Sequence, residues 1–287
     1  MATVPRVITR TINGSRILAA MQQGKAYVAV PNTTLNEALG INAALQPENS
    51  AQPIVAYYGI GNNGHVFRTA GDGMQYPQAR KHSPDDFGLY NQIPFLLRDP
   101  DDDITAAERA NYGLRKIITV NNVNYIAYYL KRLIISADPV KMLQITVQDG
   151  VSTSVEFIPT QANLNPTPTD PAATGAVSTD GTYLVTSAIA TIEFSENDVT
   201  ELMEVARIMY GTVERALISE LAIVAGADRI VSITDPGQSP FNMREVVAAQ
   251  IVTHITGLWP VAYYANGFTY ALDIGANEPK TGITTGT

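Results

Sequence analysis

Alternating hydrophobic and polar positions in the middle of the chain predict two β-hairpins. The first covers residues 115–135 and turns at Asn121-Asn122, a pair that tolerates the positive φ angles of a tight turn. The second covers residues 143–158 and turns at Asp149-Gly150, which is among the strongest hairpin signals. Its second arm alternates apolar and polar side chains, as a strand with two different faces does. The centre of the protein is therefore predicted to be antiparallel β structure.

A helical period in the last third predicts a group of about three helices. The first begins at the capping sequence after Ser195 and ends at Gly211, with its apolar residues on one stripe. Two further helices are predicted over 213–225 and 239–256, followed by a hairpin over 261–274.

The rest of the chain predicts short elements separated by an irregular loop over 59–86. Helices are expected over 15–23, 35–45 and 105–112, and strands over 26–30, 54–58, 93–98 and 183–194. Because strands and helices segregate along the chain, we expect an α+β fold of antiparallel hairpins and sheet with a C-terminal helical group. One domain over 1–287 accommodates this, with an optional division into a β-rich part, 1–194, and a helical part with the terminal hairpin, 195–287.

The segment 163–181 is rich in Pro, Thr, Ala and Gly and predicts a long loop without regular structure. Such a segment in a compact protein is usually a binding arm, a lid or a linker. We expect it to carry contacts between subunits, through Asn165, Pro166 and Pro168, and expect the same of the 59–86 loop.

The content of charged residues and of cysteine limits the kinds of partner and site that the protein can have. Charged residues make up 16% of the chain, against about 25% in an average globular protein. Either much of the surface faces neighbouring subunits, or it is covered by Thr, Asn and Gln, and both interpretations stay open. The net charge of −8 and the lack of a basic cluster disfavour a nucleic-acid partner. Without cysteine there is no disulfide, thiolate metal site or cysteine nucleophile.

No apolar run is long enough for a membrane span, and residues 1–6 lack the apolar core of a secretion signal. We therefore expect a protein that is made in a reducing cytoplasm and stays there until it assembles.

Two motifs that resemble cofactor sites lack the surrounding sequence that their chemistry needs. Gly59-x-Gly61-x-x-Gly64 has the glycine spacing of a dinucleotide site, but no helix is predicted to begin there and face a pyrophosphate. The acidic run 99–103 suggests a calcium loop, but Ile104 and Ala110 stand where an EF-hand needs Gly and Glu. We interpret the glycines as a tight loop with close backbone approach, and the acidic run as favouring the start of the next helix through its dipole.

Histidines and carboxylates leave a metal-dependent hydrolase as an alternative function. His65 and His82 fall in one predicted loop, with Asp85 and Asp86 beside them and Asp72 between them. His254 is expected in a helix, packed or on the surface. No sequence of the G-x-S-x-G type marks a serine nucleophile. We expect no catalytic residues, no cofactor and no bound metal, so the protein is predicted not to be an enzyme.

Pairs of tyrosines occur in three predicted strands, and each pair is expected to point one ring to either face of a sheet. Tyrosine is enriched at protein interfaces. We therefore predict interface contacts by Tyr58, Tyr129 and Tyr264, against the alternative that tyrosine simply favours strands.

Several passages together resemble virion structural proteins of tailed bacteriophages, particularly tail, baseplate-wedge and neck subunits. They are Tyr57 to His65 (YYGIGNNGH), Ile93 to Arg98 (IPFLLR), Asp101 to Asp103 with Thr105 to Arg109 (TAAER), Tyr125 to Arg132 (YIAYYLKR) and Asn163 to Pro168 (NLNPTP). The likeness is one of style and order over roughly residues 54–275, and it carries no catalytic residues. It implies a subunit present in several copies, bound to unlike neighbours.

From this resemblance we expect a structural subunit of a virion, in the tail or baseplate, with a neck or connector subunit as the alternative. Its expected partners are copies of itself and other virion proteins, with no direct contact to nucleic acid or membrane.

Overall fold

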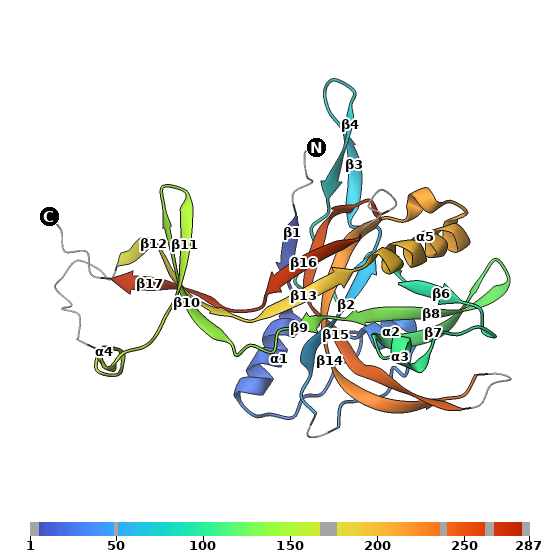
Figure 1. Ribbon diagram of the computed structural model, residues 1–287, viewed down its shortest axis with the longest axis horizontal. Coiled ribbons are helices and arrows are strands. Elements are labelled where there is room, and N and C mark those ends of the chain that lie inside the picture. Colours follow the sequence, from blue (N-terminus) through green and yellow to red (C-terminus); the bar gives the residue numbers. More distant parts are fainter. Residues whose placement is uncertain (1–5, 49–50, 167–176, 236–239, 262–266, 283–287) are drawn as a thin grey trace. The chain divides into compact units, whose positions relative to one another are not determined.

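A computed structural model describes residues 6–48, 51–166, 177–235, 240–261 and 267–282 (Figure 1). Strands make up 47% of the structure and helices 17%, so the expected α+β class with a C-terminal helical group is wrong and the protein is mostly β. The chain forms two compact units. Unit 1 consists of residues 1–133 and 193–269, and unit 2 of residues 134–192 and 270–287. This division does not follow the expected one at residue 194.

Unit 1 is built on an eight-stranded sheet, in the order β1-β15-β14-β2-β8-β6, with β5 paired to β2 and β7 paired to β8. Its strands are β1 (Val7–Arg10), β2 (Ile54–Gly61), β5 (Gln92–Ile93), β6 (Leu96–Arg98), β7 (Tyr112–Val120), β8 (Val123–Arg132), β14 (Ile218–Ile233) and β15 (Phe241–Trp259). All of the described strand pairs in this sheet are antiparallel.

The two predicted helices over 213–225 and 239–256 are in fact the long strands β14 and β15. Residues 218–227 of β14 are buried on both faces, so they form a continuous apolar run without the alternation that marks a half-exposed strand. Such a run cannot be distinguished from a buried helix by its period alone. Gly226 does not end a helix, because it lies within β14. A Cβ added at Gly226 would come 2.3 Å from a methyl group of Val246.

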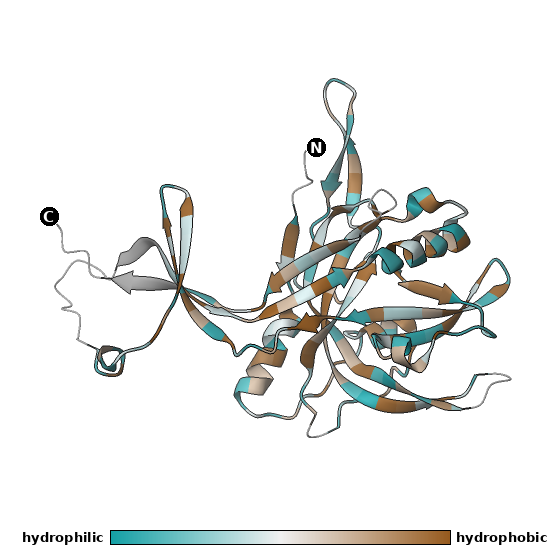
Figure 2. Cartoon of the chain, viewed as in Figure 1, coloured by the Kyte–Doolittle hydropathy of each residue, from teal (hydrophilic) through white to brown (hydrophobic). Residues whose placement is uncertain are grey.

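Four α-helices belong to unit 1 among its described residues: α1 (Ile12–Gln22), α2 (Leu35–Leu39), α3 (Ala106–Arg109) and α5 (Glu196–Tyr210). The predicted capping box of α3 is present, with Thr105 and Glu108 each bonding the other's backbone. The predicted helix after Ser195 is confirmed as α5, which ends at Gly211 with a φ of 77°. Its alternating hydrophobic and hydrophilic bands are visible in Figure 2, and its apolar stripe faces the core.

Several shorter predictions need correction. The predicted strand over 26–30 has no regular structure, and the helix predicted over 35–45 ends at Leu39. The segment 59–86 was expected to be an irregular loop, yet it contains the hairpin of β3 (His65–Thr69) and β4 (Gln75–Ala79). The many polar residues and glycines of this hairpin hide its strand period, and most of its side chains are exposed.

Both central hairpins are confirmed. β7 and β8 turn at Asn121-Asn122, whose φ angles are 51° and 63°. In unit 2, β10 (Lys141–Gln148) and β11 (Val151–Glu156) turn at Asp149-Gly150, whose φ angles are 51° and 77°. Local turn chemistry was sufficient to predict these elements because it fixes the backbone conformation directly.

The sheet of unit 2 has four strands in the order β11-β10-β12-β17, with β12 at Val177–Ser187 and β17 at Asn277–Gly282. Short helix α4 (Gln161–Leu164) precedes the part of the predicted 163–181 arm, residues 167–176, that lies outside the described residues. A further three-stranded sheet has the order β16-β13-β9, formed by β16 (Phe268–Asp273), β13 (Ile189–Phe194) and β9 (Ile134–Ile135). In the described part of the chain, no helix is long and apolar enough to cross a membrane.

Candidate functional site

Glu220, near the start of β14, has no exposed surface and is the most enclosed charged group among the described residues of unit 1. The pairing of β14 with β15 shifts register between Ile218 and Glu220, so the strand has an irregularity at Ser219. Such bulges re-aim side chains next to the ladder. Here the Ser219 hydroxyl accepts a hydrogen bond of 2.8 Å from the Gly64 N–H.

The Glu220 carboxylate collects backbone and side-chain donors from two loops. One oxygen accepts the N–H of Asn63 at 2.9 Å and that of Asn91 at 3.3 Å. The other oxygen accepts the N–H of Tyr90 at 2.7 Å and lies 3.2 Å from Nε2 of His82. Burial alone would raise the pKa of Glu220, but these hydrogen bonds outweigh it and hold the pKa below its usual range. Glu220 therefore ties the turn at 62–64 and the loop at 80–92 to the sheet.

His82 lies between two carboxylates. Its Nδ1 is 2.8 Å from Asp86 and its Nε2 is 3.2 Å from Glu220. The ring stacks between Tyr90, at 4.0 Å, and His254, at 3.8 Å between centroids. Burial would raise the pKa of Asp86, but hydrogen bonds from the Ser83 N–H and His82 hold it below its usual range.

His254, on β15, completes this cluster as a neutral ring. Its Nε2 donates to the backbone carbonyl of Asp86 at 3.1 Å, while its Nδ1 is buried and has no partner. Burial lowers the pKa of His254 to about 4, and the neighbouring His82 acts in the same direction. His254 was expected to lie in a helix, packed or on the surface; it is packed, but on a strand.

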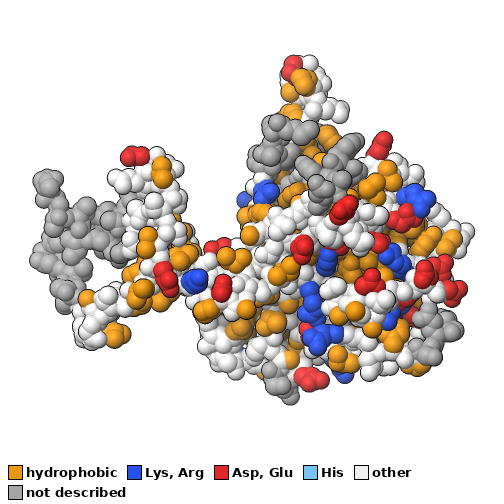
Figure 3. Space-filling model, in the orientation of Figure 1, with side chains coloured by type: hydrophobic (Ala, Val, Ile, Leu, Met, Phe, Trp, Pro, Cys, Tyr) orange, Lys and Arg blue, Asp and Glu red, His pale blue; other side chains and the backbone are white. Residues whose placement is uncertain are grey.

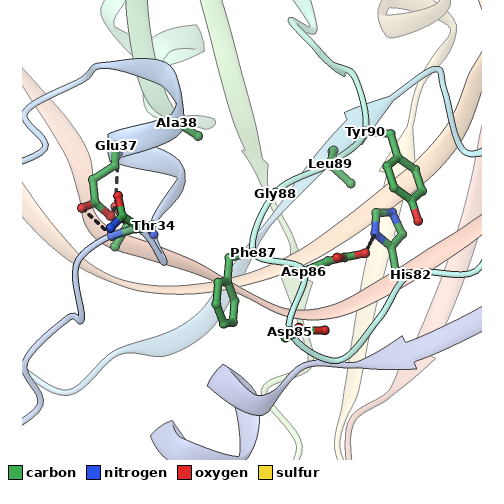
Figure 4. Close-up of a pocket in the computed structure, with 11 residues that line it drawn as sticks. Thr34, Glu37, Ala38, His82, Asp85, Asp86, Phe87, Gly88, Leu89 and Tyr90 are labelled. Atoms are coloured by element: carbon green, nitrogen blue, oxygen red, sulfur yellow. Dashed lines mark hydrogen bonds and ion pairs between the residues drawn. The ribbon is translucent and has the colours of Figure 1, made fainter.

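A pocket of about 530 Å³ lies beside this cluster, between the 85–90 loop and α2. Figure 4 shows Tyr90 next to His82, and Thr34 with Glu37 at the start of α2. Its acidic groups are already bonded: Glu37 to the backbone at the start of α2, Asp86 to His82, and Asp85 to the hydroxyl of Ser83. Because these carboxylates and both nitrogens of His82 have partners within the chain, the arrangement acts as an anchor for the loop.

The predicted metal set is only partly brought together. His82 and Asp86 are in contact, but His65 packs edge-on against Phe67 in the β3–β4 hairpin, and Asp72 lies at the hairpin's turn. Across the described ranges of the chain, no group of three or more His, Asp or Glu side chains is placed to hold a metal ion. The hydrolase alternative therefore has no assembled metal centre in this part of the molecule.

The acidic run 99–103 contributes a second buried ionic cluster. Asp103 accepts hydrogen bonds from Arg109 at 2.8 Å, from Arg115 at 3.1 Å and from the Tyr128 hydroxyl at 2.7 Å. Arg115 also bonds Asp235, 120 residues further along the chain. This part of the run binds arginines and holds strands together, a role that the helix-dipole interpretation did not include.

The predicted interface tyrosines that the structure describes are in the core. Tyr58 has no exposed surface and donates its hydroxyl to the Glu193 carbonyl at 2.8 Å, and Tyr129 is also buried. Both tyrosines contact the chain's own core, because both faces of the unit 1 sheet are covered. Tyr264 and Pro168 lie outside the described residues. Asn165 and Pro166 are exposed next to α4, and their predicted role in contacts stays a prediction.

Several apolar side chains of unit 2 are exposed. Val151 is 64% exposed, Val155 66% and Ile158 73%. The register of β10 with β11 and β12 places Val151, Val155 and Met142 on one face of the sheet, and Leu143 and Ile145 on the other, where they are half-buried. Hydrophobic side chains are accordingly visible on the surface around β10 and β11 (Figure 3). Within unit 2, the described residues provide no second layer for either face.

The sequence held a weak signal for Glu220. Gly61 and Gly64, from the apparent cofactor motif, are the residues that let this carboxylate approach: an added Cβ would come 2.9 Å from Glu220 Oε1 at Gly61, and 2.4 Å from Glu220 Cγ at Gly64. Gly61 and Gly64 are therefore points of close approach, as expected, but the expected tight loop is wrong for Gly59 and Gly61, which lie within strand β2. Glu220 itself was missed, because residues 213–225 were predicted to be a helix.

Comparison with known proteins identifies a family but no characterised relative. The model of a family of unknown function, DUF7208, matches residues 1–286. Comparisons with curated proteins and with solved structures gave no match. Since the match covers almost the whole chain, the protein belongs to this family, DUF7208, whose function is unknown.

Proposed function

We propose that this chain is a structural subunit of a tailed-phage virion, placed in the tail or baseplate, which acts through contacts with copies of itself and with other virion proteins. The proposal assigns it no catalytic role and no cofactor. The resemblance of its sequence to virion structural proteins suggested this role, and the surface of unit 2 supports it.

The observation that carries the proposal is the sheet of unit 2, for which the described residues provide no second layer. A β-sheet normally buries at least one face against another layer, because the side chains of a lone sheet stay in water. β11 exposes Val151 and Val155 on one face, while Leu143 and Ile145 are only half-buried on the other. Apolar surface of this kind marks an interaction site. Another protein subunit would supply the missing layer.

The charged groups of unit 1 support the same conclusion indirectly. Glu220, His82 and Asp86 are bonded to one another and to backbone amides, so their charges stabilise the fold. A catalytic base needs a free lone pair within reach of a substrate. Both oxygens of Glu220 are instead occupied by donors within the chain, and one oxygen of Asp86 accepts hydrogen bonds from His82 and the Ser83 N–H.

A test of this proposal is the protein content of virus particles. We expect peptides of this chain in particles purified from the phage that encodes it, at several copies per particle by quantitative mass spectrometry. A stop codon early in the gene should abolish infectious particles, and the gene supplied in trans should restore them. Particles that lack the chain and remain infectious would refute the proposal.

The role of unit 2 can be tested in the same complementation system. Val155→Asp places a charge on the exposed face of β11 and should abolish the rescue, because a charge on a buried interface is unpaired. Ile230→Asp is the matched control, since Ile230 is similarly exposed, at 58%, on β14 of unit 1. Equal rescue by the two variants would contradict the importance of the unit 2 surface.

A further inference from the structure

The two edges of the unit 2 sheet differ in how they are protected. Exposed edge strands normally carry lysine, proline or a bulge, which prevent pairing with another chain. β17, at one edge, contains Pro279 and Lys280. β11, at the other edge, has no proline and no lysine, and its register with β10 has no bulge. The free edge of β11 is therefore suited to accept another strand.

The backbone groups that β11 presents at this edge follow from its register. The Phe157 N–H donates to the Met142 carbonyl of β10 at 2.8 Å. In an antiparallel pair, residues alternate between those bonded to the neighbouring strand and those whose N–H and C=O point away from it. Val151, Thr153 and Val155 therefore face β10. The backbone groups of Ser152, Ser154 and Glu156 point outward, where no described strand lies.

The order of side chains along β11 fits a second copy of the same strand. We propose that β11 pairs with β11 of a second copy of this chain, antiparallel, about a two-fold axis at Ser154. This proposal rests on the proposed structural role of the chain. It identifies a second copy of the chain as the partner of the unit 2 surface. Two-fold contacts of identical surfaces are the commonest way in which protein chains self-associate.

The register about Ser154 places no like charges opposite each other. It sets Thr153 opposite Val155, Ser152 opposite Glu156, and Val151 opposite Phe157 of the second copy. Aromatic and β-branched pairs stabilise antiparallel sheets, whereas like charges directly opposite one another destabilise them. Here no charge meets a like charge, and every outward-facing residue finds a partner. Centring the axis on Thr153 would instead leave Glu156 opposite the turn.

The pairing also extends the apolar face of unit 2. Val151, Val155 and Phe157 lie on one face of β11, alternating with residues of the other face. After pairing, the same residues of the second copy continue that face, and the two hairpins form one wider sheet. A sheet of more strands is more stable than an isolated hairpin.

Cysteine cross-linking tests this register directly, because the full-length chain has no cysteine of its own. In the proposed pair, the two copies of Ser154 are hydrogen-bonded partners, whose Cα atoms lie about 5.5 Å apart. This separation is within the range for a disulfide. The two copies of Ser152 would be separated by about 14 Å along the strands, which is too far.

We expect Ser154→Cys to form an oxidised dimer about tenfold faster than Ser152→Cys or Glu156→Cys alone, because facing thiols have a high effective concentration. A mixture of Ser152→Cys and Glu156→Cys should cross-link like Ser154→Cys, since these positions face each other. Circular dichroism shows whether each variant is folded. Equal cross-linking at all three positions would overturn the register.

A second experiment measures the association without a disulfide. The wild-type chain should sediment as a reversible dimer in analytical ultracentrifugation. Ser154→Lys should weaken this dimer by roughly fivefold, because it places two cations opposite each other. Gln148→Lys is the control, as it adds the same charge on β10, away from the free edge. A wild-type monomer at every concentration, or equal effects of the two lysines, would overturn self-pairing.

The two proposals fail separately. If the chain is present in particles but its β11 residues cross-link to a different virion protein, the structural role stands and self-pairing is refuted. If the chain dimerises through Ser154 but is absent from particles, the pairing stands and the virion role is refuted.

Discussion

Units 1 and 2 are both built on antiparallel sheets, but among the described residues only unit 1 covers both faces of its sheet. In unit 1, β14 and β15 are buried for much of their length, and charged groups such as Glu220 are bonded within the core. In unit 2, β11 is exposed along its whole length. Similar strands therefore serve different purposes in the two units. The sheet of unit 1 stabilises its own fold, whereas the sheet of unit 2 exposes apolar side chains and an unpaired backbone edge that a neighbouring chain could bind.

The largest expected effect is the loss of a buried charge in unit 1. Glu220→Ala removes the acceptor of three backbone N–H groups and leaves His82 facing a cavity. Breaking a buried pair by removing one partner costs about 3–5 kcal/mol. We expect a decrease of this size in the free energy of unfolding, measured by urea denaturation. Glu156→Ala, on exposed β11, is the control and should change it by less than about 0.5 kcal/mol.

A pair of identical substitutions compares packing in the two units. Val224→Ala in β14 removes buried methyl groups and should cost about 2–3 kcal/mol. Val155→Ala removes the same groups from a side chain that is 66% exposed, and should cost less than about 0.5 kcal/mol. Hydrogen exchange measured by mass spectrometry reports on each unit separately. Similar losses at both positions would show that Val155 is covered in the isolated chain.

Protonation of His254, on β15, should make the stability of unit 1 depend on pH. His254 has a folded pKa of about 4, against an ordinary value of about 6.5. As the pH falls, the unfolded state therefore binds the proton first. The stability that the neutral His254 contributes is complete above about pH 6.5 and is lost as the pH approaches 4. Neighbouring His82, Asp86 and Glu220 face the ring.

The expected loss from His254 is about 2 kcal/mol between pH 7 and pH 5, measured by urea denaturation at each pH. His254→Gln should flatten the slope over this range, whatever its effect on stability at pH 7. The depressed pKa values of Glu220 and Asp86 act at lower pH, because carboxylates with lowered pKa lose their stabilising bonds only as they become protonated. An unchanged slope in His254→Gln would contradict the assignment.

Two glycine substitutions should have an equally modest effect in both units. Gly211, which ends α5, and Gly150, in the β10–β11 turn, each have a φ of 77° and open space around the missing Cβ. Alanine at either position is strained only by the backbone, at a cost of about 1 kcal/mol. We expect equal losses of local stability at these two glycines and unequal losses at Val224 and Val155. That combination would show that the two units differ in packing and not in backbone strain.

Sequence reasoning succeeded where short-range chemistry decides the structure. The turns at Asn121-Asn122 and Asp149-Gly150 and the cap at Ser195 each fix a few dihedral angles, so the nearby residues suffice to predict them. It failed for β14 and β15, because a strand buried on both faces loses its period of two and resembles a buried helix.

The candidate sites show the same limit. His82 and Asp86 are four residues apart and could be paired from the sequence, but their partners Glu220 and His254 come from distant strands. Tyr58 and Tyr129 were predicted at interfaces because each belongs to a tyrosine pair that points one ring to either face of a strand, and tyrosine is enriched at interfaces. Which faces of a sheet are covered depends on the other layers, and that information is absent from any single strand.

The sequence by itself determined the central hairpins, the capped helix α5, the close approach at Gly61 and Gly64, and the apolar alternation of Val151 and Val155. Each follows from the stereochemistry of a few adjacent residues. Tertiary structure alone decided that residues 218–259 contain two long strands, that Glu220 gathers two loops, and that β11 is an unprotected edge. These features depend on which strands become neighbours, and strand pairing joins residues that are far apart in the chain.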